Sequence, residues 1–212
     1  MGTNAARPSD IRAGLRLEIA TVIWMVVESA VALGAGIVAG SILLTAFGID
    51  SVIELLSGSV LLWRFSVEAL GGDVERVEQV ENRATWVVAV TLMLLCIYVL
   101  VSSLFGLATQ SKPDGSLVGI VISVAAVIVM PWLGISKRRL ADRIDSDALR
   151  VDAAENFTCG YMAATVLVGL ALNAAFHWWW AEDIAALVFL FWLVVEAREA
   201  FDEAREGREG AD

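Results

Sequence analysis

The chain has 212 residues, is 58% hydrophobic and carries a formal net charge of −10 at pH 7. This apolar content lies far above that of an average soluble domain, so an ordinary soluble globular protein is excluded. The sequence has no polybasic surface of the kind that binds nucleic acid. We therefore predict an all-α polytopic membrane protein whose main partner is the lipid bilayer.

Six apolar stretches are long enough to cross a bilayer, for which roughly 20 helical residues are needed. They are predicted at residues 17–39, 42–64, 84–108, 116–136, 149–173 and 180–197. The chain then consists of a cytoplasmic N-terminal segment (1–16), a six-helix transmembrane domain (17–200) and an acidic cytoplasmic tail (201–212).

The cationic residues predict the orientation of this bundle. Of the 15 Lys and Arg residues, all except Lys112 fall on one side of the predicted spans. The positive-inside rule therefore predicts that both termini lie in the cytoplasm. The short chain favours a cell (inner) membrane location, with the first span as the targeting signal.

Acidic residues lie at similar depth inside two of the predicted spans. Asp50 and Glu54 are spaced i, i+4 in the second span, and Glu155 and Cys159 have the same spacing in the fifth. Residues at this spacing project from one helix face. Because a carboxylate at mid-bilayer costs roughly 2.5–3.5 kcal/mol even on lenient scales, we expect the two faces to meet around a cation. The alternative is that these groups merely form hydrogen bonds between helices.

Three further acids in the spans have separate predictions. Asp152 lies on the Glu155 face nearer the cytoplasm, which makes it a candidate access ligand for the metal. Glu28, in the middle of the first span, is either a proton carrier or an interhelical hydrogen-bond partner. Glu196 lies near a predicted cytoplasmic end, where we expect its side chain to extend toward water.

The chemistry of these ligands predicts exchange of metal for protons. Several carboxylates held together cannot all be ionised without a cation, so either protons or a metal must neutralise them. A mixed carboxylate and thiolate site fits Zn²⁺ best, with Cd²⁺, Fe²⁺ and Co²⁺ as further candidates. If Cys159 serves only for packing, the ligands are all oxygen and Mn²⁺ or Fe²⁺ becomes more favourable. The metal is then the transported substrate, and no resident cofactor is predicted.

Two segments resemble the cation diffusion facilitator superfamily, namely residues 39–51 (AGSILLTAFGIDS) and residues 146–152 (SDALRVD). The resemblance implies six transmembrane helices with cytoplasmic termini, and a homodimer that exports divalent metal, commonly zinc, in exchange for protons. It places the family's two ligand pairs on Asp50 and Glu54, and on Glu155 and Cys159. Both pairs lack histidine, Cys159 replaces the usual Asp, and the family's C-terminal cytoplasmic domain is not expected after Ala200.

We therefore predict a divalent cation transporter that works by alternating access. The alternative is a membrane scaffold or metal sensor that keeps the fold but does not transport. An enzyme is not predicted, because the sequence has no HExxH motif and its single histidine, His177, lies outside the predicted bundle.

Overall fold

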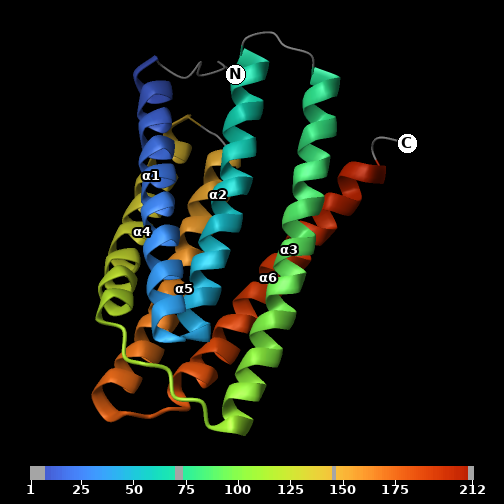
Figure 1. Cartoon of the computed structure of the whole chain (residues 1–212). Coiled ribbons are helices and arrows are strands. Elements are labelled where there is room, and N and C mark those ends of the chain that lie inside the picture. Colours follow the sequence, from blue (N-terminus) through green and yellow to red (C-terminus); the bar gives the residue numbers. More distant parts are fainter. Residues whose placement is uncertain (1–7, 70–73, 145–146, 210–212) are drawn as a thin grey trace.

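The computed structural model describes residues 8–69, 74–144 and 147–209. Within these ranges the chain forms six helices and no strand, which confirms the all-α prediction (Figure 1). The helices are α1 (Pro8–Ala39), α2 (Ile42–Ala69), α3 (Val74–Thr109), α4 (Leu117–Ile144), α5 (Asp147–Phe176) and α6 (Ala181–Glu209). Each covers one of the six apolar stretches to within one residue, and most extend beyond it at the end that was predicted to face the cytoplasm.

The six helices pack as three pairs. The most extensive contacts join α4 to α5, α3 to α6 and α1 to α2. The pairs then contact one another through α1 with α4, α2 with α3, and α5 with α6. Helix α6 crosses the bundle obliquely from beneath α5 toward the far end of α3 (Figure 1). This tilt brings the middle of α6 against α2, although the two helices are far apart in the sequence.

The α1–α2 pair depends on two glycines. A Cβ atom on Gly36 would lie 2.7 Å from the backbone nitrogen of Thr45, and one on Gly48 would lie 2.7 Å from that of Leu33. Such distances are shorter than any normal contact, so both positions need hydrogen in place of a side chain. The connecting turn uses Gly40, whose φ of 63° ends α1 in the left-handed conformation that glycine favours.

We expect Gly36→Ala to destabilise the folded chain by about 1–3 kcal/mol, because its methyl group would overlap the backbone of α2. Gly34→Ala is the matched control, since a Cβ there meets nothing within 4 Å. It should be neutral or slightly stabilising, because alanine favours a helix more than glycine does. Thermal unfolding in detergent, followed by circular dichroism, measures both. Equal midpoints for the two variants would contradict this account of the α1–α2 contact.

In the part of the chain that the structure describes, four helices are long and apolar enough to cross a membrane. The qualifying segments are residues 13–39 of α1, 85–109 of α3, 117–144 of α4 and 152–176 of α5. Their outward faces carry large apolar side chains that other helices leave uncovered, such as Val38 (85% exposed) and Phe105 (68% exposed). A surface of this kind suits lipid. The spans predicted at 42–64 and 180–197, and the orientation, stay predictions.

A buried polar network joins the connections at one end of the bundle. Glu182, in the first turn of α6, accepts hydrogen bonds from Ser41 Oγ and, at 2.7 Å, from Asn173 Nδ2. The same Asn173 amide lies 3.2 Å from the carbonyl oxygen of Pro113, to which it donates. Glu182 is 2% exposed. The network therefore ties the start of α6 to α5, to the α1–α2 turn and to the α3–α4 connection.

Candidate metal-binding site

Three carboxylates from two helices converge in the middle of the bundle. Among the residues that the structure describes, Asp50 and Glu54 of α2 and Glu196 of α6 each offer one oxygen, and these atoms all lie within 4.8 Å of one another. We call these three residues the central acidic cluster. Asp50 is 1% exposed, and the other two side chains are half-buried. The spacing is compatible with three oxygens that bind one cation.

The apolar pattern of both helices explains why these acids face inward. On α2, Asp50 lies seven residues after Leu43 and three after Phe47, so it continues the buried face of that helix. On α6, Glu196 lies seven residues after Phe189 and continues the corresponding face. The rings of Phe47 and Phe189 meet edge to face, with centroids 6.4 Å apart. This contact packs α2 against α6 next to the cluster, on the side nearer the α1–α2 turn and the start of α6.

Ionising the carboxyl groups of the cluster without a cation costs much free energy. In the described part of the chain neither oxygen of Asp50 has a hydrogen-bond partner, and neither does Oε2 of Glu196. An ionised carboxylate buried without partners is strongly disfavoured, and nearby like charges increase the cost. The cluster therefore needs a proton or a cation, and it can accept either.

Cys159 connects α5 to this cluster. Its Sγ atom lies 3.3 Å from Oε2 of Glu54 and 3.9 Å from Oε1 of Glu28, and its side chain is 1% exposed. Three of the residues predicted from the sequence, Asp50, Glu54 and Cys159, are thus brought together. The thiol can contribute a sulfur ligand only if it gives up its proton.

Glu28 is fully buried beside this group, at the junction of α1, α2 and α5. One of its oxygens accepts a hydrogen bond of 2.9 Å from Ser51 Oγ, and the other accepts one of 2.5 Å from Trp24 Nε1. The interhelical hydrogen bond that the sequence offered as one alternative is therefore present. Its contact with Cys159 also places it in a continuous line of ionisable groups that leads to Glu54.

The other two predicted ligands lie elsewhere. Glu155 is exposed on α5 and lies outside the cluster, although it is near enough to interact electrostatically with Glu54 and Glu196. Asp152 forms an ion pair with Lys137 of α4, with 2.6 Å between Oδ2 and Nζ. Their roles as metal ligands stay predictions.

Glu196 is the residue that sequence reasoning missed. The expectation that its side chain extends toward water at the cytoplasmic end is wrong, because the carboxylate belongs to the central acidic cluster. A signal was present in the apolar residues at 189, 193 and 197, which mark the inward face of α6. The oblique path of α6 was not in the sequence pattern, and it shifts the depth of Glu196 relative to α2 (Figure 1).

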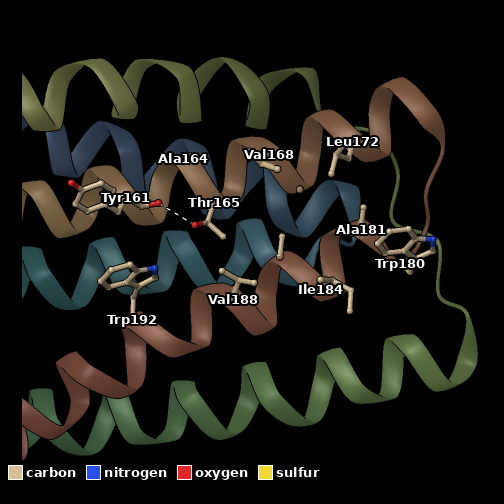
Figure 2. Close-up of a pocket in the computed structure, with 12 residues that line it drawn as sticks. Tyr161, Ala164, Thr165, Val168, Leu172, Trp180, Ala181, Ile184, Val188 and Trp192 are labelled. Atoms are coloured by element: carbon tan, nitrogen blue, oxygen red, sulfur yellow. Dashed lines mark hydrogen bonds between the residues drawn. The ribbon is translucent and has the colours of Figure 1, made fainter.

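A separate apolar groove of about 430 Å³ lies between α5 and α6 (Figure 2). Tyr161 and Trp192 stack at one end of it, with ring centroids 5.9 Å apart, and Trp180 lies at the other. Trp192 is one helical turn from Glu196, but the residues that line the groove include no charged side chain. The groove therefore presents no carboxylate or thiolate ligand for a cation.

Comparison with known proteins identifies the family of this chain. The family model described as the cation efflux transmembrane domain matches residues 19–206. A relative from Synechocystis sp., named as an uncharacterized transporter, is 25% identical over 158 residues, which cover 73% of this chain and 51% of the relative. The chain thus spans about half the length of that protein. With apolar helices that can cross a membrane and acids gathered between them, the chain is an integral membrane protein that belongs to the cation diffusion facilitator family of cation transporters.

Proposed function

We propose that this protein exports a divalent metal cation from the cytoplasm in exchange for protons, by alternating access, and that Zn²⁺ is its preferred substrate. The observation that carries the proposal is the central acidic cluster, with the Cys159 thiol against Glu54. Burying several acids costs free energy unless a cation or protons neutralise them, so a site of this kind is expected where ions bind reversibly.

The ligand set supports the choice of metal. Asp50, Glu54 and Glu196 supply oxygen and Cys159 supplies sulfur, and this mixture favours Zn²⁺, Cd²⁺, Co²⁺ or Fe²⁺ over Mg²⁺. Glu155 and Asp152 serve as outer ligands along the access route in this proposal. Mn²⁺ becomes the better substrate if the thiol stays protonated.

Competition between metal and protons couples the two fluxes. Metal binding must displace protons from carboxyl groups and from the thiol, and protonation must release the metal. Glu28 is suited to carry such a proton, because its carboxyl group contacts both Cys159 and Ser51. In the proposed topology all six helices span the inner membrane of the cell, both termini face the cytoplasm, and two copies associate through membrane helices.

Metal flux in proteoliposomes tests this function together with the role of Cys159. Under an imposed pH gradient the wild-type chain should move Zn²⁺, and Cys159→Ser should lower the ratio of Zn²⁺ to Mn²⁺ flux by about tenfold, because a hydroxyl is a harder ligand than a thiolate. Cys96→Ser is the control for the same chemical change, since Cys96 lies on α3 and is not one of the three residues of the central acidic cluster.

Two results would count against the proposal in different ways. An unchanged flux ratio in Cys159→Ser would remove the thiol from coordination. Absence of flux for every divalent metal tested with folded wild-type protein, with or without a pH gradient, would contradict transport itself.

A further inference from the structure

A buried lysine joins three helices at the end of the bundle where α1 begins. Lys137 of α4 is completely buried, and its Nζ atom lies 2.6 Å from Oδ2 of Asp152 on α5. The same Nζ atom lies 3.2 Å from both carboxylate oxygens of Glu18 on α1. We call these three residues the inner ion triad. A buried ammonium between two carboxylates is stable only while it keeps its partners, since a lone buried charge is strongly disfavoured.

The two ion pairs of the triad differ in what they connect. Lys137 and Asp152 belong to α4 and α5, which pack so closely that a Cβ on Gly134 would lie 3.1 Å from the carbonyl oxygen of Ala153. Glu18 belongs to the α1–α2 pair. The Lys137–Asp152 contact therefore lies within one helix pair, whereas the Lys137–Glu18 contact joins that pair to another.

A line of inward polar residues leads from the triad to the central acidic cluster. Asn156 follows Asp152 by four residues on α5, and Cys159 follows it by seven, so the three share one helix face. Asn156 is 4% exposed, and its Nδ2 atom has no hydrogen-bond partner in the described part of the chain. With a rise of 1.5 Å per residue, roughly 10 Å along α5 separates the triad from Cys159.

We propose that the Lys137–Glu18 bridge of the inner ion triad closes the cytoplasmic mouth of the cation path, and that the mouth opens when Lys137 releases Glu18. The Lys137 ammonium is a tethered cation that occupies the two acids an arriving metal meets first. Separation of α1 from α4 at this bridge exposes the polar face of α5 and, through it, Cys159. The assignment rests on the proposed function for the existence of the cation path and for which side of the membrane is the cytoplasm.

The accessibility of Cys159 tests the proposal without any measurement of transport. In a Cys96→Ala background Cys159 is the sole thiol of the chain. A charged, membrane-impermeant thiol reagent is applied from the side on which α1 begins. Glu18→Gln and Lys137→Met both remove the bridge, and each should accelerate labelling by about tenfold or more as the open population rises.

Two variants separate loss of this bridge from general loosening. Asp152→Asn keeps the Lys137–Glu18 bridge and should label within about twofold of the parent. Asp202→Asn changes an exposed acid at the same end of the bundle and should label like the parent. Thermal unfolding confirms that each variant is folded, and if one bridge variant does not fold, the other still decides the outcome.

The proposal is overturned if folded Glu18→Gln or Lys137→Met labels at the parental rate. Equal acceleration in all four variants also overturns it, because the effect is then not specific to the bridge. Labelling requires no metal movement, so a failure of the flux experiment leaves this result unaffected, and the reverse also holds.

Discussion

Asp50→Asn should reduce metal-dependent flux by more than about 100-fold, a larger loss than the 10–100-fold typical of residues that only support a metal ligand. The carboxylate of Asp50 is 1% exposed and belongs to the only group of three acids that converges within the described residues. Asparagine keeps the shape of the side chain but removes the negative charge and half of its acceptor capacity. Metal affinity should fall for the same reason.

The fold should survive this substitution. An unpartnered carboxylate is a poor occupant of an apolar interior, so without metal Asp50→Asn should unfold at the same temperature as the parent or above it. Asp114→Asn makes the same chemical change at an exposed position and should leave flux unchanged. Parental flux in folded Asp50→Asn protein would take Asp50 out of the transport mechanism.

Glu196→Gln should weaken Zn²⁺ binding by about 100-fold, whereas Glu155→Gln should weaken it by about tenfold or less. Glu196 lies within the cluster, and Glu155 is exposed and acts on the cluster through its charge at a distance. Both substitutions remove one negative charge from the same region. The difference between them therefore reports direct coordination rather than the electrostatic field.

Calorimetric titration of both purified variants with Zn²⁺ makes this comparison. The opposite order of affinities would mean that α5 rotates to bring Glu155 into the site, as the i, i+4 pairing with Cys159 suggests. Equal and small effects would confine the site to Asp50, Glu54 and Cys159. In the second case Glu196 has no direct role in binding.

The helices were predictable because each depends on local pattern. Apolar runs of adequate length set the six elements. The close α1–α2 approach uses Gly36 and Gly48, whereas a Cβ on Gly34 would meet nothing within 4 Å. Which of several glycines lies at the contact depends on the rotation of each helix about its axis, and composition does not reveal that rotation.

The site was predictable where it depends on one helix and unpredictable where it depends on several. Asp50 and Glu54 share a face of α2, and this follows from their spacing alone. Four residues advance a helix by slightly more than one turn, and on α5 Cys159 is buried while Glu155 is exposed. The ion pair of Lys137 with Asp152 depends on how α4 packs against α5, and the convergence of Glu196 on Asp50 depends on how α6 crosses α2.

The three-pair architecture distributes the residues around the site over different helix pairs, so ion binding depends on how these pairs are arranged. Asp50 and Glu54 belong to the α1–α2 pair, Glu196 to the α3–α6 pair and Cys159 to the α4–α5 pair. A slide of one pair against another by a single ångström changes the number of atoms that can touch an ion at once. The coordination number of the ion, and with it the affinity of the site, then depends on displacements between the helix pairs that leave each helix intact.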